Sequence, residues 1–537
     1  MKKINPIAWI PLSVAISLVA GIWLGGYFHG HDSTSGGIHK LNTILGLIDR
    51  DYVDTVDIDE LVELSIPEIL ANLDPHSTYI PASDLRSVND ELEGSFSGIG
   101  IQFSIMNDTI SVIESIAGGP SEKVGIMAGD RIVQIGDSIV AGIGITNEQV
   151  LSMLRGPEGT RVKLGIKRNS ARKTLNYEVT RGAIPVTSVD ASYIVSPGIG
   201  YIKVNKFGRT TYDEFLTALT SLRRQGAEKY LVDLRGNGGG YMEIAILMAN
   251  EFLPEGSPIV YTKGRNGIQD PAFSDGNGSF QDAEIAVLID EFSASASEIF
   301  AGAIQDNDRG LIIGRRSFGK GLVQRQSVLP DSSAMRLTIA RYYTPSGRCI
   351  QKEYTPGKGD SYSSEIIERY NHGEAYSADS MKIDRSQLFH TAAGREVYGG
   401  GGIIPDVFTP NVTTGVSSYY MDVANAGLLQ RFAFSYADLN RESLNGEKDM
   451  AKFLKGLPPD DVLLQSFVRY AAQNGVPARW YYINKSHDLL VNQLKALIAR
   501  DLLGYNAFYS IYNQRDSSVK TAIEQLTDGN ARFPLGK

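Results

Sequence analysis

Residues 285–299 read IAVLIDEFSASASEI, and this stretch decides the fold class. The run from Ile285 to Ile289 is short and entirely apolar, which predicts a buried strand, and the residues after it predict a helix from Ser295 to Gln305. A buried strand that leads through a tight corner into a helix is typical of α/β proteins.

The same alternation surrounds this stretch. Strands are expected at residues 200–204 and 230–234, with a helix at 214–224 between them. We therefore expect one α/β domain over residues 185–410. Within it, residues 352–395 are polar and irregular, which favours an insertion or a flexible cover.

Two regions of different character flank this domain. Residues 96–184 hold short β-runs separated by turns, with one helix at 148–154, and this pattern predicts a small β domain. Residues 411–537 turn helical and predict a C-terminal extension. One amphipathic face of this extension is formed by Leu490, Leu494, Leu497 and Ile498.

The N-terminal region predicts export. Two lysines open the chain, and an apolar run from Ile7 to about Phe28 follows, which is long enough to span a bilayer with the lysines in the cytoplasm. We expect a cytoplasmic stub and a transmembrane anchor within residues 1–32. A cleaved signal peptide is the alternative, but no A-x-A site follows the run. Residues 38–95 then predict a helical segment.

Composition excludes several functions. The chain of 537 residues has a formal charge of −9, which argues against a nucleic-acid partner. Cys349 is the only cysteine, so an intrachain disulfide, a cysteine-only metal cluster and a lipoprotein anchor are excluded. The sequence also lacks His-Glu-x-x-His and Gly-x-Ser-x-Gly motifs. We expect no metal and no cofactor.

Three serines lie at the predicted corner: Ser293, Ser295 and Ser297. A serine at such a corner exposes its hydroxyl, and the amides of the helix N-terminus can stabilise negative charge. The simpler interpretation is a helix N-cap, because serine followed by glutamate is a common helix start. The residues alone do not choose among the three serines.

A second stretch, residues 314–324, reads GRRSFGKGLVQ. It resembles a phosphate-binding loop, but Gly321 stands where serine or threonine must hold Mg²⁺. A lysine in a glycine-rich surface turn is another alternative. A third interpretation is that Lys320 lies close to one of the serines and acts as a general base, because a buried lysine with a lowered pKa can deprotonate a serine.

A third stretch, residues 233–240, reads DLRGNGGG and follows a predicted strand. Turns rich in glycine present bare backbone N–H groups, which suit an oxyanion hole. An ordinary strand-to-helix turn has the same composition, so this stretch alone is a weak signal.

Together, and in this order, the three stretches resemble those of the C-terminal processing peptidases, also called tail-specific proteases. Three more stretches agree with that family: LDPHS at 73–77, YTPSGR at 343–348 and GGIIPD at 401–406. The resemblance extends over about residues 38–410 and implies an α/β serine-peptidase core.

The resemblance also implies roles for single residues. Ser295 corresponds to the nucleophile, Lys320 to the general base and Gln324 to the residue that orients the lysine. The amides of Ala296 and of a glycine near Gly239 are expected to form the oxyanion hole. Cys349 is interpreted as a packing residue.

The β domain at residues 96–184 similarly resembles a PDZ domain. Such domains bind an extended C-terminus by strand addition, and backbone amides hold its carboxylate. The residues that match the carboxylate-binding loop are Gly98, Ile99, Gly100 and Ile101. Arg155, just before the last predicted strand of this domain, could couple ligand occupancy to the catalytic core through a salt bridge. A β-module without a ligand and a solvated arginine are the alternatives.

The resemblance predicts a multidomain serine endopeptidase with a Ser-Lys dyad. It would process or degrade exported proteins near or from their C-termini, and the PDZ domain would bind the tail. Expected partners are protein substrates with accessible apolar C-termini and the membrane, and a homo-oligomer is compatible with the sequence. The expected location is the bacterial inner membrane, single-pass, with the catalytic part in the periplasm. A non-catalytic peptide-binding protein of the same architecture is the alternative.

Overall fold

The computed structural model describes residues 35–116, 118–168, 171–444 and 449–531. The chain divides into two compact units, Met1–Asn72 and Leu73–Lys537, which are considered separately below. The anchor expected within residues 1–32 lies outside the described residues. No helix in the described ranges combines the length and the apolar character needed to cross a membrane.

The first unit contributes two described helices, α2 (Ser35–Asp51) and α3 (Ile58–Ala71). The helical character expected from residue 38 onward is therefore present in this part of the chain. The carboxylate of Asp57 caps α3, because it accepts hydrogen bonds from the amides of Asp59 and Glu60.

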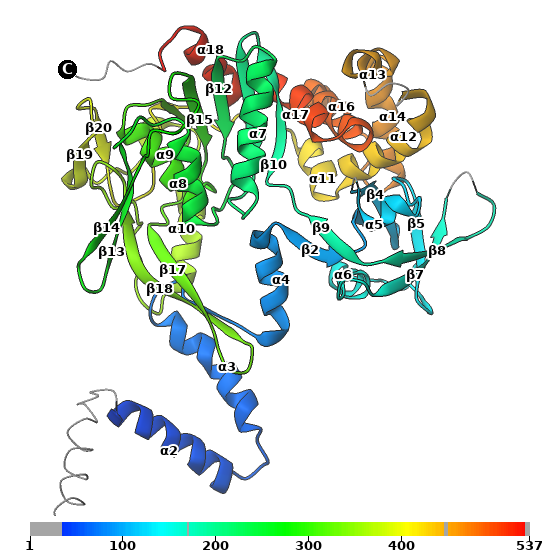
Figure 1. The fold of residues 1–537 in the computed structure, drawn as a ribbon. Helices are drawn as coiled ribbons and strands as arrows, with labels where there is room; N and C mark the ends of the chain where they lie inside the picture. Colours follow the sequence, from blue (N-terminus) through cyan, green and yellow to red (C-terminus); the bar gives the residue numbers. More distant parts are fainter. Residues whose placement is uncertain (1–34, 117, 169–170, 445–448, 532–537) are drawn as a thin grey trace, which may run out of the picture. The chain divides into compact units, whose positions relative to one another are not determined.

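The second unit contains an α/β core built on one six-stranded sheet (Figure 1). Its strand order is β10 (Val189–Ser196), β11 (Ile199–Val204), β12 (Lys229–Asp233), β15 (Glu284–Ile289), β16 (Leu311–Gly314) and β21 (Val407–Phe408). Only the β10–β11 pair is antiparallel. Parallel strands are buried on both faces, which explains why β11 and β15 are buried along their whole length.

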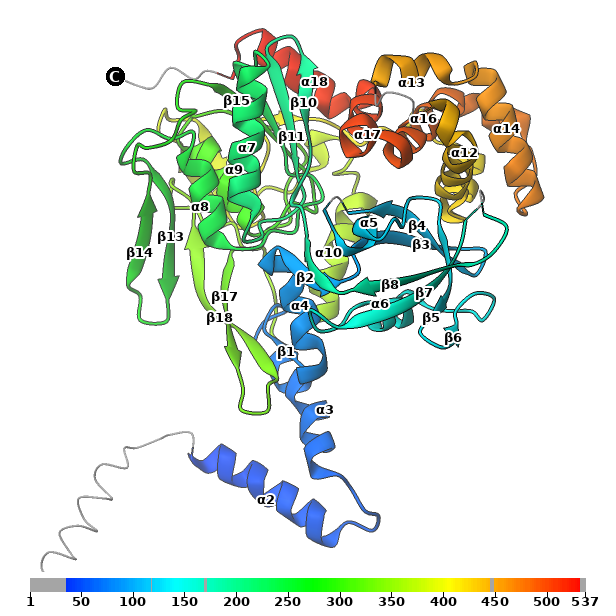
Figure 2. The same ribbon diagram turned by 45° about the vertical axis from the view of Figure 1, so that its right-hand side comes forward.

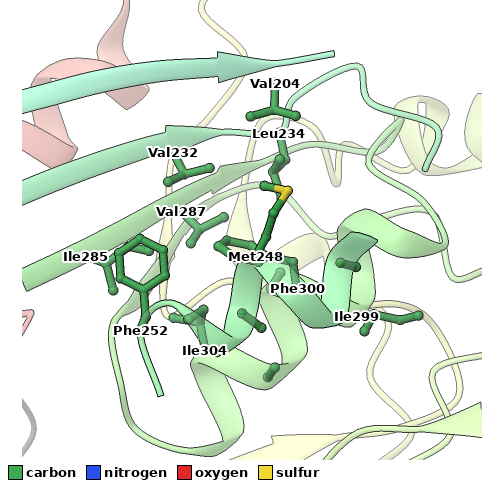
Figure 3. Packing of buried hydrophobic residues seen from close by; sticks show 14 of the residues in the cluster. Val204, Val232, Leu234, Met248, Phe252, Ile285, Val287, Ile299, Phe300 and Ile304 are labelled. Atoms are coloured by element: carbon green, nitrogen blue, oxygen red, sulfur yellow. The ribbon is translucent and has the colours of Figure 1, made fainter. Parts of the chain in front are cut away.

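Three helices cover one face of this sheet: α7 (Thr211–Arg224), α8 (Met242–Asn250) and α9 (Ala296–Asp306). Figure 3 shows the packing between them, where Met248 and Phe300 meet Val232 and Val287 of the central strands. The strands and helices expected around residues 200–304 are thus confirmed. Burial of these side chains supplies the main stabilisation of the layer, at about 1.5–3 kcal/mol for each large apolar residue.

The opposite face is covered by the end of the chain. In α18 (Ser517–Thr527), Val519, Ala522 and Leu526 pack on Leu231 and Leu288 of the sheet. The last helix is therefore a layer of the α/β core, although it lies more than a hundred residues beyond β21. The boundary placed at residue 410 rests on a change in composition, and it separates α18 from the core sheet on which that helix packs.

A second sheet, which the sequence analysis did not predict, stands beside the core. It contains β1 (Thr78–Ile80), β18 (Ala334–Tyr343), β13 (Pro258–Gly264) and β14 (Gln269–Phe273), and β17 (Leu322–Val328) also pairs with β18. Its strand β17 begins at Leu322, two residues after Lys320. The N-terminal segment expected to be helical therefore also supplies a strand, β1, besides α4 (Ala82–Glu93).

The predicted β domain is present (Figure 2, cyan). Its strand order is β3 (Ile101–Met106), β4 (Thr109–Ser115), β5 (Arg131–Ile135), β7 (Arg161–Lys167) and β8 (Leu175–Thr180), with β6 (Ser138–Ile139) paired to β5. The short helices α5 (Pro120–Lys123) and α6 (Asn147–Leu154) complete it. The chain enters and leaves the domain through the paired strands β2 (Ser95–Gly98) and β9 (Gly182–Pro185).

The C-terminal region is helical, as expected. Its helices are α11 (Ser418–Asn425), α12 (Leu428–Leu444), α13 (Met450–Gly456), α14 (Asp460–Gln473), α15 (Trp480–Lys485), α16 (His487–Leu503) and α17 (Tyr505–Tyr512). The predicted amphipathic face lies on α16, and all four of its residues are buried in one apolar cluster.

One expectation for the core was wrong. Residues 352–395 are not irregular throughout, because they contain the helix α10 (Gly359–Asn371). Its polar composition concealed it, since buried Arg369 is held by hydrogen bonds and ion pairs that a hydropathy pattern does not register.

Candidate active site

Ser295 lies at the corner between β15 and α9, with backbone angles φ 58 and ψ −114. A residue other than glycine rarely adopts a positive φ, and such a conformation costs about 1–3 kcal/mol, which the surrounding structure must offset. Strain of this kind is typical of a nucleophile elbow, where a sharp turn exposes a serine hydroxyl at a helix N-terminus. The sequence lacks the glycine motif of that elbow, but the backbone has its geometry.

The three serines of the corner have different surroundings. The Ser293 hydroxyl is buried and donates to the carbonyl of Leu234 at 2.9 Å. The Ser297 hydroxyl is also buried and donates to the carbonyl of Asn237 at 2.9 Å. Ser295, in contrast, lines an open cavity. The outer two serines therefore fasten the corner to the glycine-rich loop, and Ser295 faces the space where a substrate can enter.

Gly239 of the glycine-rich loop lies against Ser295. A Cβ at this position would be 2.7 Å from the Ser295 Cβ and 3.0 Å from the Ala296 nitrogen, and its φ is +102. Only glycine fits this approach. The Gly239 N–H donates to Asn237 Oδ1 at 2.9 Å. It can therefore reach an oxyanion only by sharing that proton or after Asn237 moves.

Ion pairs of Arg235 hold the glycine-rich loop in place. The Arg235 guanidinium contacts Asp233 at 2.6 Å and Asp516 at 2.8 Å, and Asp233 also accepts from the Tyr201 hydroxyl at 2.8 Å. Burial opposes ionisation of Asp233, but the charges of Arg235 and Lys203 hold its pKa far below the ordinary value. Because Asp516 also caps α18, this ion pair ties the helix directly to the glycine-rich loop.

Lys320 lies just before β17, and its Nζ donates to Gln324 Oε1 at 3.0 Å. Burial lowers the pKa of Lys320, and the nearby charge of Arg336 lowers it further, whereas Glu298 and Asp74 oppose the shift. A lowered pKa makes neutral lysine more available as a base. The amide Nε2 of Gln324 donates in turn to the carbonyl of His76.

Glu298 joins the loops of Ser295 and Lys320, and the sequence analysis did not identify it. Its carboxylate accepts from the amides of Ser295 at 2.8 Å and Lys320 at 2.9 Å, and from the amide of Gly319 and the hydroxyl of Ser317. Burial raises its pKa to about 7, although these hydrogen bonds oppose the shift. The serine-to-glutamate spacing was a signal for this residue, but it was interpreted only as a helix cap.

The cavity in front of these residues has a volume of about 850 Å³. Its walls come from α4, the glycine-rich loop, α9, β17 and β18, and it contains both Ser295 and Lys320. Leu151 and Arg155 of the β domain also line it. The guanidinium of Arg155 stacks on the Phe96 ring at 4.6 Å. The β domain therefore borders the cleft that holds the candidate nucleophile.

The four residues predicted to bind a carboxylate run from the last residue of β2 to the first residue of β3. Ile99 is buried, and its carbonyl accepts from the amide of Ser121. Gly100 has a φ of +74, and its carbonyl accepts from the amide of Ile116. Among the described residues, β3 pairs only with β4, so its other edge is available for an added strand.

The structure gives little support for a metal site or for a cysteine nucleophile. Within the described ranges, no group of His, Cys, Asp and Glu side chains is arranged to hold a metal ion. The Cys349 thiol has a pKa raised by burial, which keeps it protonated and poorly nucleophilic.

Comparison with known proteins assigns the core and the β domain to known families. The model of Peptidase family S41 matches residues 198–357, and the model of the PDZ domain matches residues 97–179. A third model, a family of unknown function (DUF8443), matches residues 419–504.

Among curated proteins, the chain is 33% identical over 395 residues to a carboxy-terminal-processing protease of Bartonella bacilliformis, covering 71% of this chain and 88% of that protein. It is 34% identical over 355 residues to the carboxy-terminal processing protease CtpA of Bacillus subtilis, covering 65% and 75%. Among solved structures, a photosystem II D1 C-terminal processing protease matches with 29% identity and a TM-score of 0.33, covering 57% of this chain and 88% of that one.

Proposed function

Because the chain belongs to the carboxy-terminal processing proteases of peptidase family S41, we propose that Ser295 and Lys320 are its catalytic dyad and that it cleaves exported proteins near their C-termini. The observation that carries this proposal is the cavity itself. It brings together a strained serine at a helix N-terminus and a partly buried lysine whose pKa is lowered.

In the proposed mechanism, neutral Lys320 accepts the proton of the Ser295 hydroxyl while Oγ attacks the scissile carbonyl carbon. The negative charge that develops on the carbonyl oxygen is stabilised by the amide of Ala296 and by a glycine amide near Gly239. Lysine then gives its proton to the leaving amine, which departs and leaves an acyl-enzyme. A water molecule hydrolyses this ester, and Lys320 again serves as the base.

Gln324 and Glu298 prepare this reaction without bonding to the substrate. Gln324 holds Nζ of Lys320 through its amide oxygen. Glu298 binds the backbone amides of both Ser295 and Lys320, so the two loops are held as one unit. Positioning of this kind supplies a large share of enzymatic rate enhancement, because a displacement of about 1 Å can cost about 10²-fold.

The substrate class follows from the β domain. A PDZ domain binds C-terminal tails, and its edge strand β3 and the loop at Gly98–Ile101 offer the required strand edge and amides. Since Arg155 of this domain lines the catalytic cavity, a bound tail would place the preceding chain near Ser295. We therefore propose protein substrates with accessible apolar C-termini.

The decisive experiment uses the exported part of the chain and an unfolded protein that carries an apolar C-terminus. Cleavage that is lost in Ser295→Ala, Lys320→Ala and Lys320→Arg supports the dyad, because arginine stays protonated. Activity in Lys320→Ala would refute it. Binding without cleavage by the wild-type chain would instead identify a non-catalytic peptide-binding protein.

We also propose that the catalytic part is exported and held at the bacterial inner membrane by the apolar run near the N-terminus. A reporter fused after Gly37 should be active only if it functions outside the cytoplasm. A soluble chain that has lost its first residues would show a cleaved signal peptide.

A further inference from the structure

We propose that helix α10 is a positioning element for the catalytic lysine, with Tyr362 and Arg369 as its positioning residues. This inference rests on the proposed role of Lys320. The helix begins at Gly359, beyond the residues 198–357 that match the peptidase family model, and it lies in a segment whose sequence predicted only a cover.

Tyr362 provides the first link between α10 and the lysine, and this link passes through His76. Its hydroxyl lies 2.7 Å from Nε2 of His76, and the two rings meet edge to face with centroids 5.1 Å apart. The carbonyl of the same His76 accepts from Nε2 of Gln324, whose Oε1 accepts from Lys320 Nζ at 3.0 Å. A chain of hydrogen bonds, joined through the covalent frame of His76, therefore runs from α10 to the lysine amine.

This chain sets the orientation of the Gln324 amide. A carbonyl oxygen can only accept, so the carbonyl of His76 selects the NH₂ end of the amide. The oxygen end then faces Lys320, where it holds Nζ in either protonation state. If His76 moved, Gln324 would lose the contact that fixes this orientation. The ring contact with Tyr362 holds His76 in place, and only 5% of Tyr362 is exposed.

Arg369 is the second contact, and it acts on the loop that carries the lysine. Its Nη1 donates to the carbonyl of Ser317 at 2.7 Å, and its Nη2 donates to the carbonyl of Phe318 at 3.2 Å. Glu365, one turn earlier on α10, binds Nε of Arg369 at 2.6 Å. The fork of this guanidinium thus binds two consecutive carbonyls, three and two residues before Lys320.

An aromatic cluster joins the two contacts. The Phe318 ring lies 5.9 Å from the Tyr362 ring, and Lys352 Nζ sits 4.1 Å from the centroid of each. Lys352 also pairs with Glu365 at 3.0 Å. The helix α10 therefore packs against the loop that carries Lys320, against His76 and against the ammonium group of Lys352.

Loosening this group should change how Lys320 titrates. The charged groups that face Lys320 are Glu298 of α9, Arg336 of β18 and Asp74 of the segment before β1. Lys352 and Asp74 face His76, which burial keeps neutral with a pKa lowered to about 4. Glu298, Arg336 and Asp74 all lie outside α10, so removing one hydroxyl of α10 leaves the charges that face Lys320 in place. A less confined Nζ becomes better hydrated, and its pKa then rises towards the ordinary value.

The test compares two matched variants of the full exported chain, Tyr362→Phe and Tyr370→Phe. Both remove one phenol hydroxyl from α10, but the Tyr370 hydroxyl binds Glu291, outside the lysine chain. Tyr362→Phe loses the contact with His76 Nε2 at 2.7 Å and the longer hydrogen bond from Gln351 Nε2 at 3.3 Å. We expect it to lower kcat about 3- to 10-fold at neutral pH, with KM unchanged. Its acid limb of kcat against pH should move to higher pH. Tyr370→Phe should leave this limb in place.

A double-mutant cycle separates positioning from general stability. If Tyr362 acts through Gln324, then Tyr362→Phe should have no further effect on kcat in a Gln324→Ala background. Arg369→Lys, which keeps the charge but loses the fork, should also lower kcat at unchanged KM. This second variant tests α10 if Tyr362→Phe does not fold.

Three results would overturn the inference: a limb that moves equally in Tyr362→Phe and Tyr370→Phe, effects of Tyr362→Phe and Gln324→Ala that simply add, or wild-type kcat in Arg369→Lys. These failures leave the dyad standing if Lys320→Ala is inactive. Activity in Lys320→Ala would remove the dyad itself, and the two failures are therefore distinguishable.

Discussion

Replacing Gly239 by alanine tests whether the close approach of the glycine-rich loop positions the nucleophile. The new Cβ would lie 2.7 Å from the Ser295 Cβ and 2.7 Å from the carbonyl oxygen of Ala294. Ordinary contact begins at 3.4 Å, so the Ser295 Cβ must retreat by about 0.7 Å. A misplacement of about 1 Å costs about 10²-fold in rate, so we expect kcat to fall about 10- to 100-fold.

Two neighbouring glycines provide controls. Gly238 has open space around its Cβ position and no positive φ, so Gly238→Ala should be close to neutral. Gly236 has a φ of +72 but also open space, so Gly236→Ala adds backbone strain of about 1–2 kcal/mol without a steric contact. Gly239→Ala has both penalties. Comparison of the three variants therefore separates strain from displacement of the serine.

The assay measures kcat and KM on an unfolded protein with an apolar C-terminus, together with thermal unfolding of each variant. Gly236→Ala should lower Tm with little change in kcat, whereas Gly239→Ala should lower both. The reasoning fails if folded Gly239→Ala keeps a kcat within about twofold of Gly238→Ala, since a crowded Ser295 would then not matter.

Three further predictions follow from the site. The rate should rise with pH along a limb set by deprotonation of Lys320, at a midpoint below the ordinary value of 10.5, because burial lowers this pKa; a kcat–pH profile that rises only above 10.5 would contradict it. Asp516→Ala leaves the partly buried Arg235 with one carboxylate fewer and should cost about 1–3 kcal/mol of unfolding free energy, measured by urea denaturation, whereas full stability would show that α18 does not brace the loop. Gly100→Glu places a side chain where Ile184 lies 2.9 Å away, and it should slow cleavage of tailed substrates but leave untailed ones unchanged; equal kcat/KM on both would exclude tail binding there.

The sequence by itself determined the elements whose signals are local. The apolar run of β15, the corner after it and the helix α9 follow from periodicity within fifteen residues. The buried face of α16 was likewise readable, because residues three and four positions apart share one side of a helix. The three glycine- and serine-rich stretches were sufficient to indicate the family, because each is a run of consecutive residues that can be recognised without knowledge of the fold.

Tertiary structure alone decided which groups meet. Ser293 and Ser297 differ from Ser295 through hydrogen bonds to carbonyls about sixty residues away, and no local pattern distinguishes the three. Glu298 resembled an ordinary helix cap until the fold brought the amide of Lys320 to its carboxylate. Helix α10 was hidden for the same reason, because its buried side chains are polar and are satisfied by distant partners. Periodicity reports burial of apolar surface, whereas a polar site is built from long-range hydrogen bonds that only the folded chain can form.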